Sequence, residues 1–111
     1  MTSYIVMVDL APGVKDLEFT DAVDVYLGKL VSEGKMVEYS IQRRAFGFSP
    51  SDMREFLITM RFHDLTQMDA AFNMVATRSE PIEGIHAAVY SKVVNFKSAL
   101  YRDFPDTVRV R

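Results

Sequence analysis

The stretch MVEYSIQRRAFGF at residues 36–48, followed by REFLITMRFH at residues 54–63, decides the fold. In both segments the character of the side chains alternates with a period of two, which is typical of a β-strand with two unlike faces. Every second residue from Phe56 to Phe62 is apolar, so this side is expected to face helices. Residues 49–52 read Ser-Pro-Ser-Asp and predict a turn. The centre of the chain therefore predicts two adjacent strands.

Strand and helix patterns flank this centre on both sides. A strand is expected at residues 4–8, followed by a helix with an apolar stripe from Phe19 to Val31 and Asp16 as its N-cap. After the central strands, Thr66 is expected to cap a second helix, whose buried stripe comprises Met68, Ala71, Phe72, Val75 and Ala76. A shorter helix ending at Tyr90 and a last strand at residues 92–102 complete the pattern.

The resulting order is β-α-β-β-α-β. Right-handed crossovers place the strands as 4-1-3-2 in an antiparallel sheet, with both long helices on one face. This is an α+β, ferredoxin-like sandwich. With 111 residues the chain fits one domain, residues 1–111, with an irregular tail over about residues 103–111.

Composition narrows the classes of function. The chain has no cysteine, which fits a reducing compartment, and no apolar run of the ~18 residues that a membrane span requires. Its formal charge of −2 argues against a phosphate-binding surface. We therefore expect a cytoplasmic protein with neither a nucleic acid nor a membrane as partner.

The sheet face that the helices leave bare is expected to be apolar. Ile5, Met7 and Leu57 fall on it by parity, together with a phenylalanine from the last strand, where Val94, Phe96 and Leu100 are expected to share a face. Such a patch exceeds the few hundred Å² that monomers usually expose. A second copy of the same sheet is the simplest cover, so the chain is expected to form a homodimer.

This layout resembles the dimeric α/β-barrel superfamily, which includes antibiotic-biosynthesis-type monooxygenases, muconolactone-isomerase-like proteins and stress-responsive barrel proteins. The resemblance covers almost the whole chain but lies in the layout alone, since no short motif identifies a subfamily. It implies a homodimer in which two sheets pack face to face into a barrel, and a pocket near the sheet of each protomer.

A ligand site is expected on the open face around Arg61 and His63, which project to the same side of one strand. A guanidinium among apolar walls can receive a carboxylate, and the imidazole can move a proton. The alternative is that Arg61 pairs with an acid such as Glu38 while His63 lies at a solvated strand end. The expected ligand-binding set is Arg61, His63, Met7, Leu57 and Thr59.

Two main functions follow from this site. The first is binding of a small hydrophobic or amphipathic molecule, including a carboxylic acid. The second is a cofactor-independent monooxygenase or isomerase of the barrel type, with His63, Tyr39 and Asp9 as candidate catalytic residues.

Other chemistries have weaker signals. His86 and Tyr90 share one side of the short helix, but a lone helical histidine is a poor indication of haem, so we expect no cofactor. Two distant histidines and no cysteine predict no metal site. The string Arg-Ala-Phe-Gly-Phe at residues 44–48 is similar to an RNA-recognition motif, but it lies on the wrong strand, so an RNA-binding module is the least favoured hypothesis.

Overall fold

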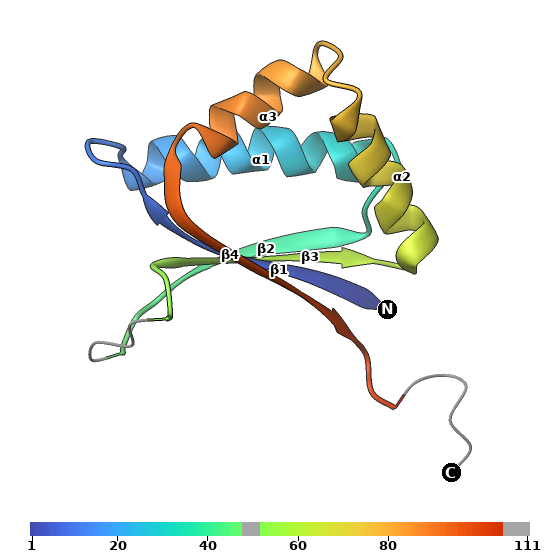
Figure 1. Cartoon of the computed structure of the whole chain (residues 1–111), viewed down its shortest axis with the longest axis horizontal. Coiled ribbons are helices and arrows are strands. Elements are labelled where there is room, and N and C mark those ends of the chain that lie inside the picture. Colours follow the sequence, from blue (N-terminus) through green and yellow to red (C-terminus); the bar gives the residue numbers. More distant parts are fainter. Residues whose placement is uncertain (48–51, 106–111) are drawn as a thin grey trace.

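The computed structural model describes residues 1–47 and 52–105 and shows three helices on one side of a four-stranded sheet (Figure 1). The elements follow the predicted order, with the shorter helix before the last strand. They are β1 (Thr2–Leu10), α1 (Asp16–Ser32), β2 (Glu38–Arg43), β3 (Phe56–Phe62), α2 (Leu65–Ala76), α3 (Ile82–Tyr90) and β4 (Val93–Arg102). The turn predicted at residues 49–52 lies, apart from Asp52, outside the described residues.

The sheet has the order β2-β3-β1-β4, which confirms the predicted arrangement. Every neighbouring pair is antiparallel. The helices all cover one face, so the fold is the ferredoxin-like α+β sandwich (Figure 1). Within the described part of the chain the opposite face carries no helix, and the two outer strands, β2 and β4, are the edges of the sheet.

The core lies between α1 and the central strands, as the alternation predicts. On β3, Phe56, Ile58 and Phe62 are buried, and Val6 and Val8 of β1 lie beside them. The α1 stripe contributes four buried side chains at helical spacing: Phe19, Val23, Leu27 and Leu30. Each large apolar side chain buried in this way stabilises the fold by about 1.5–3 kcal/mol.

Both predicted helix caps are displaced by one or two residues. Lys15 is the N-cap of α1, so Asp16 is its first helical residue, and the Glu18 carboxylate accepts a bond from the Lys15 backbone N–H. Asp64, not Thr66, caps α2, since its extended backbone lets its carboxylate accept from the Gln67 N–H at 2.8 Å. An aspartate at the end of β3 supplies the cap before the helical pattern of apolar residues begins.

A bulge in β4 separates three residues that were expected to share a face, Val94 from Phe96 and Leu100. The register shifts between Met7, which faces Lys97, and Asp9, which faces Val94. Val94 therefore lies on the open face of the sheet, whereas Phe96 points to the helix side. The extra residue is Asn95, whose φ of 58° lies in the left-handed region that asparagine tolerates better than most residues.

Hydrogen bonds hold this bulge in place. The Asp9 carboxylate accepts from the Asn95 side-chain amide at 2.9 Å and from the Glu55 backbone N–H at 2.9 Å. The guanidinium of Arg54 donates to the Asn95 carbonyl at 2.9 Å. The bulge is therefore fixed from β1 and from the segment that leads into β3. No phenylalanine of β4 lies on the open face, contrary to the prediction.

Candidate functional site

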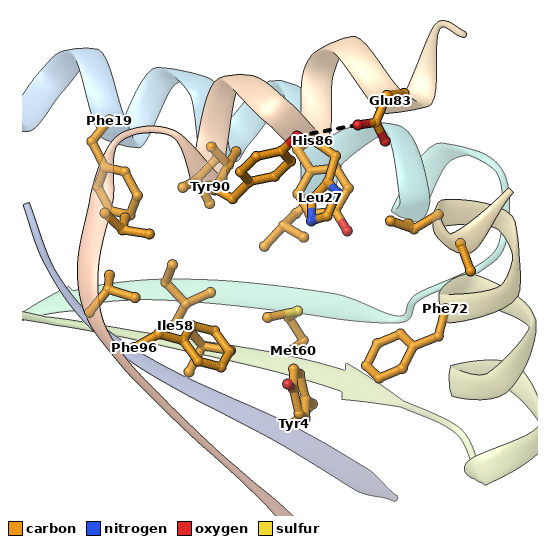
Figure 2. Close-up of a pocket in the computed structure, with 18 of the residues that line it drawn as sticks. Tyr4, Phe19, Leu27, Ile58, Met60, Phe72, Glu83, His86, Tyr90 and Phe96 are labelled. Atoms are coloured by element: carbon orange, nitrogen blue, oxygen red, sulfur yellow. Dashed lines mark hydrogen bonds between the residues drawn. The ribbon is translucent and has the colours of Figure 1, made fainter. Parts of the chain in front are cut away.

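A cavity of about 650 Å³ lies between the helices and the sheet. Its floor is the helix-facing side of the central strands, and α1 and α3 form its roof (Figure 2). Most of the lining is apolar, including Val6, Val8, Val23, Leu27, Ile58 and Met60. The sequence patterns that predict the core thus also supply the walls of the cavity.

The cavity opens to solvent between α2, α3 and β4. Each of these elements places one aromatic side chain at the rim: Phe72, Tyr90 and Phe96 are 40%, 49% and 57% exposed. Phe72 was expected in a closed core stripe, and Ala76 of the same stripe is also exposed. The stripe of α2 is buried at Ala71, and it borders the cavity at Phe72, Val75 and Ala76.

Three aromatic rings form one wall of the cavity. The ring of His86 lies 4.9 Å from that of Tyr26 and 5.0 Å from that of Tyr90. The Tyr90 hydroxyl donates to the Glu83 carboxylate at 3.3 Å (Figure 2). We call Tyr26, His86 and Tyr90 the aromatic wall.

Burial perturbs the titration of two members of this wall. It raises the pKa of Tyr26 to about 12, with a smaller contribution from Tyr4. It also lowers the pKa of His86 below its usual value; Arg78 acts in the same direction and Glu83 against it. At neutral pH the wall therefore presents a neutral imidazole, which can accept a proton, and a protonated phenol.

The facing side of the cavity is also aromatic. The rings of Tyr4 and Phe72 meet edge to face at 5.2 Å, and Phe72 meets the buried Phe62 at 6.3 Å. Both Tyr4 and Phe72 line the cavity opposite the roof (Figure 2). A flat ring bound in the cavity would therefore meet aromatic side chains above and below.

Arg78 is the one positively charged residue among the described residues that line the cavity. It follows the end of α2, with a φ of 55°. Within residues 1–47 and 52–105 its guanidinium forms no ion pair. The cavity therefore has a cation whose charge no carboxylate of the described residues neutralises by direct contact.

The ligand-binding residues expected from the sequence lie away from this cavity. Arg61 donates to the Ser3 hydroxyl at 3.0 Å and lies 3.6 Å from the Glu38 carboxylate and 3.4 Å from that of Asp103. Thr59 is on the same face of β3, and His63 is exposed at its end. The pairing of Arg61 with Glu38 is the arrangement that we gave as the alternative to a ligand.

Met7 and Leu57 border a second hollow, of about 520 Å³, at the end of the sheet where β2 leads toward β3. Arg43, Arg44 and Phe46 also line it, and Arg43 is already paired with the carboxylates of Asp16 and Glu55. Phe46, from the string similar to an RNA-recognition motif, is 87% exposed, whereas Phe48 lies outside the described residues.

The three candidate catalytic residues are not brought together. The Tyr39 hydroxyl donates to the Asp24 carboxylate of α1 at 2.8 Å. Asp9 holds the β4 bulge, and His63 donates its backbone N–H to the Gln67 side chain at 2.7 Å. None of the three lines the 650 Å³ cavity.

Sequence reasoning missed the residues that do line it. Tyr26 belongs to the apolar stripe of α1, and a stripe residue gives no sign of whether it faces packed side chains or a cavity. The spacing of His86 and Tyr90 was the one available signal. Among residues 1–47 and 52–105, no three His, Cys, Asp or Glu side chains are grouped so that they could hold a metal. No helix in these ranges is long and apolar enough to cross a membrane.

Comparison with known proteins places the chain in a family and a fold. A family described as a family of unknown function, DUF6614, matches residues 1–111. No curated protein matches the sequence. The structure is similar to that of an Arabidopsis thaliana protein, with a TM-score of 0.76, 7% identity and coverage of 99% of this chain and 100% of that one.

Two further structures carry informative descriptions. SnoaB, a cofactor-independent oxygenase from Streptomyces nogalater, matches with a TM-score of 0.71 and 7% identity over 97% of each chain. A dimeric ferredoxin-like protein of unknown function from Jannaschia sp. CCS1 matches with a TM-score of 0.66 and 13% identity, over 92% of this chain and 98% of that one. At these identities the likeness establishes the fold, and it confirms the resemblance to dimeric ferredoxin-like proteins.

Proposed function

The chain belongs to DUF6614, and from that premise we propose that it is a homodimeric protein that binds a small hydrophobic or amphipathic molecule in the cavity between its helices and its sheet. The observation that carries the proposal is the cavity of about 650 Å³ with its exposed aromatic rim. Cavities of roughly 300–1,000 Å³, mostly apolar with a few polar groups, are typical of small-molecule sites.

The exposed aromatic side chains at the cavity opening favour a bound ligand. Phe72, Tyr90 and Phe96 leave between two fifths and three fifths of their surface in water around an apolar opening. A ligand that covers them removes apolar surface from solvent at about 25 cal/mol per Å². A movement of the protein that closes the cavity opening would also remove this apolar surface from water. The bulge at Asn95, however, holds Phe96 at the cavity mouth.

Tryptophan fluorescence tests this site directly, because the chain contains no tryptophan. In a Tyr90→Trp variant the only indole lies at the cavity rim. Titration with a small aromatic or fatty-acid panel is expected to change its emission in a saturable way. A Leu17→Trp variant is the control, since Leu17 is 72% exposed on α1 and does not line the cavity. Equal changes in both variants, or none in either, would contradict the proposal.

The homodimer rests on the open face of the sheet. Ile5, Met7 and Leu57 lie on it without helix cover, and Tyr101 lies beside Ser3 on the same face. Two copies of this face, packed together, would bury a self-complementary apolar surface. Several solved structures with this fold are described as dimers, which agrees with the proposal.

Light scattering of the wild type and one charge variant tests the dimer. Leu57→Glu puts a carboxylate in each half of the proposed interface, so it is expected to give a monomer at micromolar concentration. Leu17→Glu is the matched control, because Leu17 is 72% exposed on α1. A monomeric wild type, or a Leu57→Glu variant that stays dimeric, would overturn this part of the proposal.

The open-face set of Arg61, His63, Met7, Leu57 and Thr59 stays a second proposed ligand site. It would lie between the sheets of the dimer, and Arg61 would have to leave its contact with Asp103 to receive an acid. The two sites are separable: Arg61→Ala would weaken binding only if the ligand lies between the sheets. A cytoplasmic location and a single domain over residues 1–111 likewise stay predictions.

A cofactor-independent oxygenase or isomerase is the second candidate function. It is favoured by the neutral imidazole of His86 at the cavity wall, and it agrees with the similarity in fold to SnoaB. In this proposal Nδ1 or Nε2 of His86 takes a proton from the bound substrate. The earlier candidates His63, Tyr39 and Asp9 would then have no direct part in the reaction.

The chain's two histidines give a matched test. His86→Gln is expected to abolish oxygen uptake or isomerisation of any substrate that the wild type converts, whereas His63→Gln is expected to retain it. The reverse result would return the catalytic role to His63. Binding without turnover of any member of the panel by the wild type would leave ligand binding as the function and contradict the enzyme proposal.

A further inference from the structure

The charged side chains that line the cavity differ in whether another residue contacts them. Glu83 has one carboxylate oxygen engaged by the Tyr90 hydroxyl at 3.3 Å. Arg78 has no carboxylate partner among residues 1–47 and 52–105. The third titratable group beside them, His86, is neutral at pH 7. A ligand that enters the cavity therefore meets one charge of each sign: the Glu83 carboxylate already accepts a hydrogen bond, whereas the Arg78 guanidinium has no carboxylate partner among the described residues.

The apolar part of the cavity is shaped for a flat ring. Tyr26 and His86 are tilted by only 33° with their centroids 4.9 Å apart, so the two rings stack on each other, and with Tyr90 they form a continuous aromatic cluster along the cavity. Tyr4 and Phe72 offer a second aromatic pair on the facing side. Aromatic rings in contact gain about 0.5–1.5 kcal/mol per pair beyond the burial of their area.

We propose that the cavity selects aromatic acids: the ring lies against the aromatic wall, and the anionic group pairs with the guanidinium of Arg78. This inference rests on the proposed function and names the class of ligand for that same cavity. A guanidinium suits this role because its planar set of N–H donors matches a carboxylate in a two-point contact. The place of Arg78 at the end of α2, beside the first turn of α3, puts the charge at the cavity and leaves the apolar floor free for the ring.

Three probes that share one ring system but differ in the charge of the head group separate the charge from the ring. They are 2-naphthoate, its neutral amide, and the corresponding naphthylmethylammonium, each titrated by calorimetry at low ionic strength. The wild type is expected to bind the acid about tenfold more tightly than the amide, and the ammonium most weakly. Added salt is expected to reduce the preference, since Arg78 lies near the surface.

Variants then assign the preference to one residue. Arg78→Gln is expected to bind acid and amide equally, while its affinity for the amide stays within about twofold of the wild type. Arg78→Lys is expected to recover part of the preference. Arg44→Gln is the matched control, because Arg44 is exposed and lines the other hollow. Circular dichroism of each variant shows whether the fold is retained.

The outcomes distinguish this inference from the proposed function. If the wild type binds the amide or the ammonium as tightly as the acid, the cavity is a ligand site but the acid preference is refuted. If the preference survives in Arg78→Gln, the anion lies elsewhere and the assignment to Arg78 is overturned. If none of the three probes binds, the cavity is not a site for aromatic ligands, and the inference fails together with the proposed function for this class.

Discussion

Asp9 is expected to act as a structural clamp, and its replacement gives a quantitative test. Its carboxylate accepts two hydrogen bonds of 2.9 Å, from the Asn95 side chain and the Glu55 backbone. Hydrogen bonds to a charged group contribute about 1.5–3 kcal/mol each when shielded, and less when water competes. Asp9 is partly accessible to water, so we expect Asp9→Ala to lower the free energy of unfolding by about 2 kcal/mol in total.

For a chain of this size that loss corresponds to a decrease in Tm of about 8 °C. Differential scanning calorimetry at one fixed protein concentration measures it, because a dimer would make Tm depend on concentration. Asp9→Asn is expected to fall between wild type and Asp9→Ala, since its side-chain oxygen still accepts from Glu55. Asp21→Ala is the control: Asp21 is exposed on α1 and should change stability by no more than about 0.5 kcal/mol.

The same clamp predicts a dependence on pH. The bond from Asn95, and secondarily that from Glu55, holds the pKa of Asp9 below its usual value of 3.8. A folded-state pKa that is lowered contributes stability above pH 3.8, and this contribution is lost as the pH falls through the folded value. The difference in stability between wild type and Asp9→Asn should therefore shrink in strong acid. An Asp9→Ala variant as stable as Asp21→Ala, at neutral and at acid pH, would refute the reasoning.

Three further predictions concern single side chains. Phe62→Ala, at a ring that is 0% exposed, is expected to lower the free energy of unfolding by about 3–5 kcal/mol in urea titrations, whereas Phe46→Ala, at a ring that is 87% exposed, should have little effect. Burial lowers the pKa of His86 below 6.5, so the unfolded chain binds the proton more readily than the folded chain does. The urea midpoint of the wild type should therefore fall as the pH drops below that value. The midpoint of His86→Gln should fall less, and an equal fall would contradict the assignment. Tyr39→Phe removes the bond to Asp24 and should cost about 0.5–1 kcal/mol of thermal stability without loss of ligand binding; lost binding at unchanged stability would restore Tyr39 as a site residue.

The sequence predicted the fold well because periodicity and chirality restrict it strongly. Alternation over residues 36–48 and 54–63 allowed one interpretation, and the apolar side from Phe56 to Phe62 does face the helices. Right-handed crossovers then left the order β2-β3-β1-β4 as the arrangement to expect, and the structure has it. The ends of elements were less certain, because more than one nearby residue, Asp64 or Thr66, can cap a helix.

The candidate site was harder to predict, since apolar stripes have the same pattern whether they meet packed side chains or a cavity. Tyr26 and Phe72 fit their stripes as well as the buried Ala71 does, yet Tyr26 and Phe72 line the cavity and Ala71 does not. Polar residues on predicted strands are natural candidates for ligand binding. The pairing of Arg61 with Glu38 is the alternative that the sequence offered, whereas its contacts with Ser3 and Asp103 join residues distant in the chain and were not predicted.

By itself, the sequence determined the elements, their order and the face of β3 that meets the helices, because those follow from local periodicity and the handedness of connections. Only the tertiary structure decided where the helices and the sheet leave a cavity between them. The shift at Asn95 reverses the face of Phe96, and Phe72 of α2 lies at the cavity opening. A cavity is the space that the side chains of elements distant in the chain leave unfilled between them. Its position is therefore set by how helices and strands pack and not by the pattern within any one of them.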